Sequence, residues 1–484
     1  MSFPFVLPSP GTMIAGVLTL LLSLIASAHV VLHKRDSRAA VGWVGLILLA
    51  PVVGSVIYVL LGINRIRRKA TEQRALPLSI HTGEFERPPR LSGDVSLVGQ
   101  AAHLEPLARL VDRIAGRPLS PGNAIESLCN GDVAYPAMLD AIDRAQKSIA
   151  LSTYIFDNDA AGMQFVLALE KAVKRGVEVR VLIDAVGARY SRPSIIRELH
   201  QHGIRVARFG VALIPWRMPY MNLRNHRKLL IIDGTIGFTG GMNIRVGNLL
   251  KSSSDHLVQD LHFRIDGPVV MNLMQAFAED WGFTTREVLQ GDMWFPHLAN
   301  TGAIVARGVT DGPDGDFEKA RLVFLGALAC AQRSVRIVTP YFVPDSVLIS
   351  AINVAGLRGV LVELVIPETS NLALVQWAST HQLWQVLQRG CRVYLSPPPF
   401  DHTKIMIVDG GWSLIGSSNW DARSLRLNWE FVVECYDHDF AAKLNELVDK
   451  KVASSKRIRK EDVDARSLPV RLRDGIARLA APYL

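Results

Sequence analysis

The feature that most constrains this chain is a short pattern that occurs twice. Residues 224–234 read RNHRKLLIIDG, so His226 and Lys228 stand at the head of an apolar run that ends in Asp233. The same order returns as His402, Lys404 and Asp409. If each run is a strand, its histidine and lysine project from one face, because side chains alternate with period two. An imidazole beside an ammonium group suits an oxyanion, above all phosphate.

The similarity between the two parts of the chain extends beyond this pattern. Seventeen residues after each histidine comes an asparagine, in turns that read GGMN and GSSN. The equivalent turn positions are Gly241 and Asn243 in the first copy, and Ser417 and Asn419 in the second. Upstream, residues 149–157 answer residues 335–344, and residues 177–184 answer residues 360–367. Self-similarity over this length predicts a duplicated domain, because solenoid repeats have shorter periods.

Two such half-sites facing each other would surround one phosphate with two imidazoles and two ammonium groups. One neutral imidazole can attack phosphorus, while the other, protonated, gives a proton to the departing alkoxide. Histidine suits both tasks because its unperturbed pKa is about 6.5. The lysines and the amides of Asn243 and Asn419 would bind the non-bridging oxygens. The sequence has no HExxH motif and no clustered cysteines, and ammonium groups repel cations, so we expect neither cofactor nor catalytic metal.

Two further carboxylates are candidates for orienting the imidazoles. Asp260 follows the first histidine by 34 residues, and Glu430 follows the second by 28, each at the head of an apolar, strand-like stretch. We expect them to hold the second ring nitrogen, as the acid does in a Ser-His-Asp array. Asp233 and Asp409 lie five residues beyond each lysine, an odd offset that points them to the opposite strand face. We expect them to bond the backbone of the following turn.

The N-terminal residues predict a membrane anchor. Hydrophobic residues make up 49% of the chain, and the mean hydropathy of +0.19 is high for a soluble enzyme. Residues 13–32 are almost wholly apolar, enough to cross a bilayer core of about 30 Å. Residues 39–64 carry no charge and predict a second span, kinked or broken at Pro51. A cleavable signal peptide and a pair of shallow re-entrant helices are the alternatives.

The charge distribution predicts an orientation and a class of partner. The second apolar stretch is followed by Arg65, Arg67, Arg68, Lys69 and Arg74. The connector at 33–38 holds fewer basic residues, so positive-inside counting places the N-terminus and the long C-terminal portion in the cytoplasm. The net charge of +9 favours anionic partners. Two N-terminal spans argue for a lipid surface and against nucleic acid.

The predicted organisation has four parts. Residues 1–69 form the two-span anchor, 70–102 a juxtamembrane linker, 103–295 the first half, and 296–484 the second half with a basic tail. Each half alternates helices with short apolar strands, which predicts an α/β fold with a mixed sheet flanked by helices. The expected helices of the first half are 133–147, 161–175, 193–202 and 271–281, and its expected strands are 148–155, 177–183 and 204–209. The tail is either a terminal helix packed on its own domain or a membrane-surface contact.

These residues resemble the phospholipase D superfamily, whose signature is HxKxxxxD twice per chain, each copy followed by a Gly-Ser/Gly-x-Asn turn. Within it the chain is similar to bacterial cardiolipin synthases, from PVVG at 51–54 to NWE at 428–430 and on to the C-terminus. The resemblance implies two pseudo-symmetric phospholipase D-type halves behind a transmembrane hairpin. It implies a catalytic set of His226, Lys228, Asp233, His402, Lys404 and Asp409.

The resemblance further implies that two phosphatidylglycerols condense to cardiolipin and glycerol through a phosphatidyl-histidine. By this analogy His226 is the nucleophile and His402 the acid and base, a choice that the residues alone leave open. The implied location is the bacterial inner membrane, with the catalytic part facing the cytoplasm and anionic phospholipids as partners. The alternatives are hydrolysis as a phospholipase D, transfer involving another alcohol or phosphatidylethanolamine, and a non-catalytic membrane scaffold. The sequence gives no oligomeric state.

One residue departs from the family pattern. Asp401 stands immediately before His402, where an apolar residue is more usual. We expect this carboxylate either to influence headgroup choice or to face solvent.

Overall fold

The computed structural model describes residues 9–34, 37–62, 99–210 and 223–481. These residues divide into an N-terminal unit of helices and a larger unit that holds both copies of the repeated motif. Most of the predicted linker, residues 70–98, lies outside the described residues, as do the basic residues between 65 and 74.

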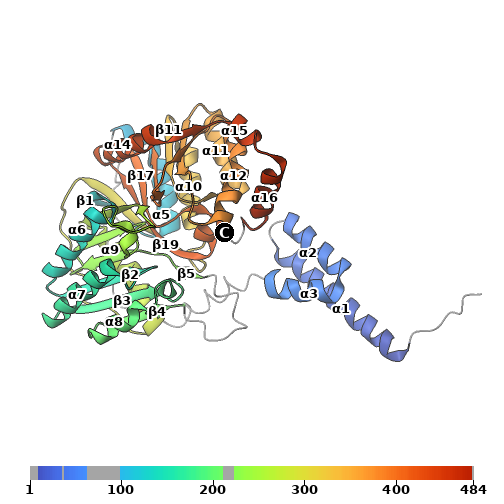
Figure 1. Cartoon of the computed structure of the whole chain (residues 1–484), viewed down its shortest axis with the longest axis horizontal. Helices are drawn as coiled ribbons and strands as arrows, with labels where there is room; N and C mark the ends of the chain where they lie inside the picture. Colours follow the sequence, from blue (N-terminus) through green and yellow to red (C-terminus); the bar gives the residue numbers. More distant parts are fainter. Residues whose placement is uncertain (1–8, 35–36, 63–98, 211–222, 482–484) are drawn as a thin grey trace, which may run out of the picture. The chain divides into compact units, whose positions relative to one another are not determined.

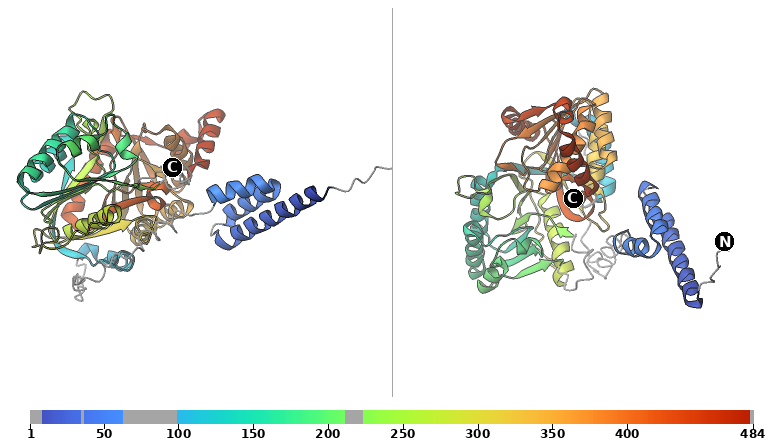
Figure 2. Two further views of the ribbon diagram at one scale, coloured as in Figure 1. Left: turned by 90° about the horizontal axis from the view of Figure 1, so that it is seen from below. Right: turned by 45° about the vertical axis from the view of Figure 1, so that its right-hand side comes forward.

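The N-terminal unit consists of helices that pack side by side (Figures 1 and 2). α1 (Pro10–His33) begins after Ser9, whose hydroxyl accepts a hydrogen bond from the amide of Thr12. Its 24 residues span about 36 Å. Within the described residues, α1 alone is long and apolar enough to cross a membrane. Val30 packs in a small core with Ile47 and Tyr58 of the following helices, while most leucines of α1 are exposed.

The second predicted span, residues 39–64, is not one continuous helix. α2 (Ser37–Leu49) ends before Pro51, and α3 (Pro51–Ile57) and a short π-helix, η1 (Tyr58–Gly62), follow. The proline ring and its missing amide hydrogen break the helix there. α3 folds back so closely that a Cβ at Gly54 would lie 2.5 Å from the carbonyl oxygen of Leu46. α2 spans only about 20 Å. The break at proline is therefore confirmed, but the two-helix transmembrane hairpin is not.

The larger unit contains a sheet in which one strand order occurs twice (Figure 1). In the first half the order is β1 (Ser120–Cys129), β9 (Leu261–Asp266), β7 (Ile236–Gly240), β6 (Leu229–Ile232), β2 (Ser148–Thr153), β3 (Glu178–Asp184), β4 (Val206–Phe209). In the second half it is β10 (Ile304–Asp311), β19 (Asn428–Tyr436), β17 (Trp412–Gly416), β16 (Ile405–Val408), β11 (Ser334–Val338), β13 (Leu361–Pro367), β14 (Arg392–Ser396), with β20 (Lys456–Ile458) at the edge. The two orders correspond strand by strand, as a duplicated domain requires.

The two halves join along an antiparallel pairing of β1 with β10. The strands β2–β3–β4 of the first half and β11–β13–β14 of the second half are parallel. The remaining pairings along this order, including that of β14 with β20, are antiparallel. The parallel strands β2, β3 and β13 are buried almost throughout, since helices cover both faces of the sheet. The predicted mixed sheet flanked by helices is confirmed.

Helices cover the two faces of each half in the same way. In the first half α6 (Asn130–Arg144), α7 (Ala160–Lys174) and α8 (Ile195–Gln201) pack on one face, and α9 (Val270–Thr285) packs on the other. In the second half the corresponding helices are α10 (Lys319–Cys330), α11 (Ser346–Leu357) and α12 (Ala373–Leu387), with α14 (His438–Ser454) opposite. Aspartates cap several of them, among them Asp159 at α7 and Asp345 at α11.

The segment before β1 packs on the second half rather than the first. α5 (Glu105–Ala115) lies in the range expected for the first half, and the 3₁₀ helix η3 (Gly99–Leu104) spans the expected boundary between the linker and that half. Leu107 and Val111 of α5 nevertheless belong to the core of the second half, against α10. α5 thus packs on the second half, although it precedes the strands of the first half in the sequence.

The C-terminal residues form α15 (Lys460–Asp464) and α16 (Leu468–Leu479), and α16 packs against α12. Ala477 of α16 shares a buried cluster with Val375 and Ala378 of α12. The expectation of a terminal helix packed on its own domain is therefore confirmed for one face of α16.

Candidate active site

Each motif histidine is positioned by the opposite half of the molecule. Short strand β5 (Arg224–Asn225) runs parallel to the start of β19, and β15 (Phe400–Asp401) runs parallel to β8 (Val258–Gln259). The amide of His226 donates to the carbonyl of Trp429 at 2.9 Å, and the amide of His402 donates to that of Gln259 at 2.7 Å. These pairings draw the histidines and lysines into extended segments just before β6 and β16, rather than onto the strands themselves as the alternation predicted.

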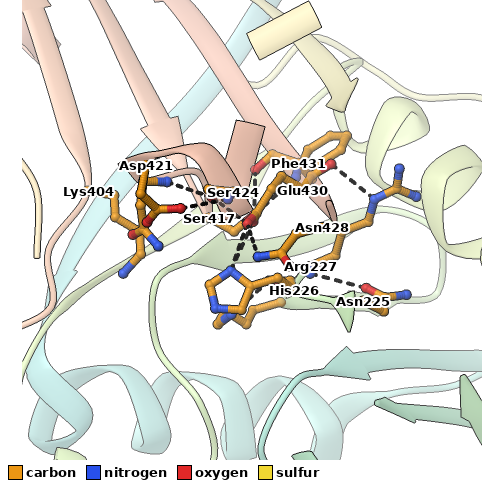
Figure 3. A network of polar contacts seen from close by, with 12 residues as sticks. Asn225, His226, Arg227, Lys404, Ser417, Asp421, Ser424, Asn428, Glu430 and Phe431 are labelled. Atoms are coloured by element: carbon orange, nitrogen blue, oxygen red, sulfur yellow. Dashed lines mark hydrogen bonds and ion pairs between the residues drawn. The ribbon is translucent and has the colours of Figure 1, made fainter. Parts of the chain in front are cut away.

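The imidazoles are held by carboxylates of the opposite half. Nδ1 of His226 lies 3.0 Å from both carboxylate oxygens of Glu430 (Figure 3). Nδ1 of His402 lies 2.8 Å from Oδ2 of Asp260. The spacing along the chain associated each carboxylate with the histidine of its own half, and the structure pairs them crosswise. The physical reason is that β19, which contains Glu430, and β8, which ends just before Asp260, pair with the short strands of the opposite half.

Glu430 is held ionised by a full set of donors. Besides His226, it accepts hydrogen bonds from the Ser424 hydroxyl at 2.5 Å and from the side-chain amide of Asn428 at 3.0 Å (Figure 3). Burial raises its pKa, but the charge and hydrogen bond of His226, together with Lys228, lower the pKa to about 2. A buried anion at Nδ1 fixes the ring and leaves Nε2 as the nitrogen for chemistry.

Asp260 is supported differently. Its carboxylate accepts from the amide of Leu261 at 2.8 Å, and burial, which raises its pKa, is outweighed by the charges of Lys404 and His402. Gly241 lies against it, and a Cβ there would come within 2.4 Å of Oδ1. The second half has Ser417 at this turn position, whose hydroxyl accepts from the Phe431 amide at 3.0 Å. The predicted turn residues therefore shape the surroundings of the two carboxylates.

The two lysines are buried beside the histidines. Nζ of Lys228 donates to the carbonyl of His226 at 2.7 Å, and Nζ of Lys404 donates to the carbonyl of His402 at 2.5 Å. Burial lowers the pKa of Lys228 to about 7 and that of Lys404 to about 8, against the opposing charges of Glu430 and Asp260. Such lysines bind and release a proton near neutrality.

The four groups act on one another across the two halves. Burial and the charge of Lys404 lower the pKa of His402 to about 4. Lys228 of the other half adds to this effect, and Asp260 opposes it. The pKa of His226 is lowered by burial, and Lys404 adds to the effect. Tyrosines flank the rings: Tyr154 lies edge-on to His226 with centroids 5.2 Å apart, and Tyr341 to His402 at 6.1 Å. The arrangement forms one site from two half-sites.

The two turn asparagines have different surroundings. The side-chain oxygen of Asn243 accepts from the amide of Ile155 at 3.1 Å. The side-chain oxygen of Asn419 is buried without a hydrogen-bond partner among the described residues. The Asn419 side chain instead bonds Asp421, whose pKa burial raises to about 7. These contacts place the asparagines in the framework of the site.

The motif aspartates lie away from the imidazoles. Asp233 accepts hydrogen bonds from the amides of residues 146–148, and Asp409 accepts them from residues 332–334. Both have positive φ, 52° and 54°, at the turn after the motif strand. His103 adds a fourth contact to Asp409, with Nε2 2.6 Å from Oδ2. The expected structural role is met, but each aspartate fixes the loop before a neighbouring strand, not the turn that comes after it.

The expectation that Asp401 faces solvent is wrong, and its influence on headgroup choice stays a prediction. Asp401 is buried, and its carboxylate accepts from the amide of Thr403 at 3.1 Å and from Nζ of Lys451 on α14 at 2.6 Å. The ammonium group of Lys451 balances the charge of this buried carboxylate.

A buried hydrogen-bond network lies behind His226 and was not predicted from the sequence. Arg227 donates through Nε to the carbonyl of Glu430 at 3.0 Å (Figure 3). It also donates through Nη1 to Asp280 at 2.9 Å. Asn225 donates to the other oxygen of Asp280 at 2.9 Å. The alternation of side chains that places His226 and Lys228 on one side of the segment places Asn225 and Arg227 on the other. This alternation could have indicated that Asn225 and Arg227 form a polar network behind the histidine.

Comparisons with known proteins identify the family of this chain. The profile of the family described as "Cardiolipin synthase, PLD-like domain" matches residues 138–281 and 324–452, and that of "Phospholipase_D-nuclease N-terminal" matches residues 21–62. The chain is 31% identical to the cardiolipin synthase of Geobacillus kaustophilus, covering 97% of this chain and 95% of the relative. It is 30% identical to cardiolipin synthase A of Pseudomonas fluorescens, with 96% of each covered.

A solved structure shares the fold. Phosphatidylserine synthase of Haemophilus influenzae superposes with a TM-score of 0.63 at 15% identity, over 78% of this chain and 100% of that one. A profile match over more than half of the residues and relatives of 30% identity along nearly the full length lead to one conclusion. The chain belongs to the cardiolipin synthase family of phospholipase D-like proteins.

Proposed function

We propose that this protein is a phosphatidyltransferase that condenses two phosphatidylglycerol molecules into cardiolipin and glycerol. The observation that supports it most is the crossed arrangement of His226 on Glu430 and His402 on Asp260. Two imidazoles, each anchored at Nδ1 by a buried carboxylate, present two Nε2 atoms to one phosphate. One serves as nucleophile and the other as proton carrier.

The reaction proceeds in two displacements. Nε2 of His226 attacks the phosphorus of the first phosphatidylglycerol, and the bond from phosphorus to the glycerol oxygen breaks. Burial and Lys404 lower the pKa of His402, whereas the phosphate anion of a lipid beside the ring favours its protonated form. In that form His402 gives its Nε2 proton to the departing glycerol. A hydroxyl of the second phosphatidylglycerol then gives its proton to His402 and attacks phosphorus, which breaks the P–N bond and releases cardiolipin. One hard displacement becomes two easier ones, and both histidines return to their starting forms.

The assignment of His226 as nucleophile follows the family resemblance and is supported by its carboxylate. Glu430 has donors from Ser424 and Asn428 in addition to His226, so it stays anionic throughout the cycle. A permanent anion at Nδ1 stabilises the positive charge that develops on the ring when Nε2 bonds to phosphorus.

The lysines supply the charge for the phosphate oxygens. Lys228 and Lys404 are buried beside the two imidazoles, and ammonium groups in a dry site stabilise an oxyanion more strongly than in water. The histidines are themselves 9% exposed. A closed site keeps water from the phosphatidyl-histidine, whose hydrolysis would give phosphatidic acid.

The proposed location is the bacterial inner membrane, with the catalytic part in the cytoplasm. α1 is long enough to cross a bilayer, and its exposed leucines need an apolar environment. The basic residues after the second apolar stretch favour a cytoplasmic side for the long C-terminal portion of the chain. Residues 1–69 then keep the enzyme at the surface where both lipid substrates reside.

An assay with one defined lipid tests the reaction. The full-length enzyme is reconstituted with phosphatidylglycerol alone, and the products are identified by mass spectrometry. Cardiolipin and glycerol in equal amounts are expected. Phosphatidic acid without cardiolipin would identify a hydrolase, and the absence of any product would favour a non-catalytic scaffold. Adding ethanolamine or phosphatidylethanolamine in separate reactions tests the other alcohols and donors.

A further inference from the structure

The outward face of α16 is apolar along its whole length. Its exposed apolar residues are Leu468 at 67%, Leu472 at 58%, Ile476 at 67% and Leu479 at 79% exposure. At 3.6 residues per turn these four positions fall within an arc of about 80°. The opposite side of the helix, with Asp474 and Ala477, is buried. A single stripe of leucine and isoleucine on a helix already packed by its other face has no role in the core.

Arginines flank this stripe on both sides. Arg471 and Arg478 lie on one side of the arc and Arg473 on the other, and all three are exposed. Arg473 also stacks on the ring of Trp377 of α12, 4.5 Å from its centroid. An apolar stripe bordered by guanidinium groups is the pattern of a helix that lies in the plane of a membrane with anionic headgroups.

A cavity of about 360 Å³ opens beside the stripe, between α12, α15 and α16. The charged residues of its lining are Lys460, Asp464, Arg466 and Arg471, and His381 and Trp384, which is 40% exposed, lie beside them. Lys460 pairs with Asp464 and Arg466 pairs with Asp474, so basic groups still outnumber acidic ones in the lining. Burial lowers the pKa of His381, the charges of Arg478 and Arg466 add to this effect, and Asp474 opposes it. An exposed tryptophan beside basic groups is typical of the interfacial region of a bilayer.

The same helix is connected to the active site. Tyr341 packs against the cluster that contains Ala477 of α16, and its ring lies 6.1 Å from that of His402. Tyr341 therefore contacts both the buried cluster behind α16 and the ring of His402. Docking of α16 on a bilayer would bring the site to the level of the lipid headgroups.

We propose that the outward face of α16, with the basic cavity beside it, is a docking surface for a bilayer of anionic phospholipid. This surface is additional to the N-terminal anchor and orients the catalytic unit. Charge complementarity selects the occupant, since a stripe with arginines on both edges matches an apolar layer under negative headgroups. The inference concerns binding and does not depend on which alcohol the enzyme uses.

Hydrogen exchange of the unmodified full-length enzyme tests the docking directly. The enzyme is placed in nanodiscs of phosphatidylcholine alone or of phosphatidylcholine with phosphatidylglycerol. Amides of residues 466–481 are expected to exchange more slowly in the anionic discs, while those of α7 are unchanged. Equal exchange in both discs would overturn the proposal. Protection that depends on protein concentration and not on lipid would show a second copy of the chain as the occupant, and would also overturn it.

Activity measurements on variants provide the second test. Leu472→Asp is compared with Leu167→Asp. Leu167 is also an exposed leucine, but it lies on α7 in the other half. With phosphatidylglycerol in the bilayer, Leu472→Asp is expected to lower the rate about tenfold, because the variant no longer inserts an apolar side chain into the lipid at this position. Arg471→Glu is expected to act in the same direction. Leu167→Asp is expected to behave as the wild type.

A soluble substrate separates this proposal from the proposed function. Short-chain phosphatidylglycerol, supplied as monomers to the same enzyme in phosphatidylcholine discs, reaches the site without docking, so all three variants are expected to match the wild type. Wild-type rates for Leu472→Asp with the bilayer substrate would refute the docking surface. A wild-type enzyme inactive on both substrates would refute the proposed function, while hydrogen exchange would still report on docking.

Discussion

The carboxylate of Glu430 lies 3.0 Å from Nδ1 of His226, although 204 residues separate them along the chain. The reciprocal contact joins Asp260 and His402 across 142 residues. Neither half can orient its own histidine, so a working site needs both halves folded and joined. This explains why the two motifs occur on one chain whose halves share a continuous sheet.

Crossed pairing predicts which carboxylate supports which histidine. Glu430→Gln should resemble His226→Ala, and Asp260→Asn should resemble His402→Ala, each with a loss of about 10²–10⁴-fold in cardiolipin formation. A phosphatidyl ester of p-nitrophenol distinguishes the two, because this leaving group departs without a general acid. Asp260→Asn should still release a burst of p-nitrophenolate, and Glu430→Gln should not. The opposite result would mean that each carboxylate serves the histidine of its own half.

Both histidines are predicted to be essential. His226→Ala and His402→Ala should each abolish turnover of phosphatidylglycerol, because the first lacks the nucleophile and the second the proton carrier. Chelators should leave the wild-type rate unchanged, since Lys228 and Lys404 occupy the positions where a cation would sit. Rates are measured by mass spectrometry of cardiolipin. Wild-type activity in either variant would refute the two-histidine mechanism.

The motif aspartates are predicted to act on stability. Asp409→Asn should lower the free energy of unfolding by about 1.5–3 kcal/mol, because a buried charged acceptor of three backbone amides is lost. Asp233→Asn is the matched variant and should lose less, since it has no counterpart of the His103 contact. Thermal unfolding of both variants checks the order. An unchanged melting temperature together with lost activity would instead indicate a direct catalytic role.

The pH dependence of kcat/KM should follow the lysines on its alkaline side. Lys228 has a pKa of about 7 and Lys404 of about 8, both lowered from 10.5, so each loses its positive charge as the pH rises through these values. The rate should therefore fall above about pH 7, because neutral amines no longer stabilise the phosphate oxygens. Lys228→Arg keeps its charge at every such pH, and in an active variant the fall should move to higher pH. An alkaline side unchanged in this variant would assign the titration to another group.

The sequence predicted the chemistry more completely than the placement of the residues. Identical spacing of His226 and His402 within their repeats, and of the asparagines after them, identified the duplicated domain and its polar groups. Periodicity also predicted α6, α7 and α9 to within a few residues, because local hydrophobic patterns determine which face of a helix is buried. The Pro51 break was predicted for the same local reason.

Contacts between distant segments were beyond local patterns. The exchange of Asp260 and Glu430 between the histidines, the packing of α5 on the second half and the pairing of Asp401 with Lys451 all depend on which surfaces meet after the strands have assembled. The spacing of residues along a chain shows which residues recur. It does not show which half of the molecule the end of a strand contacts. The sequence by itself thus determined two half-sites and their reactive groups. Only the tertiary structure decided that each half completes the other, because the short strands that come just before the histidines pair with strands of the opposite half and not within their own half.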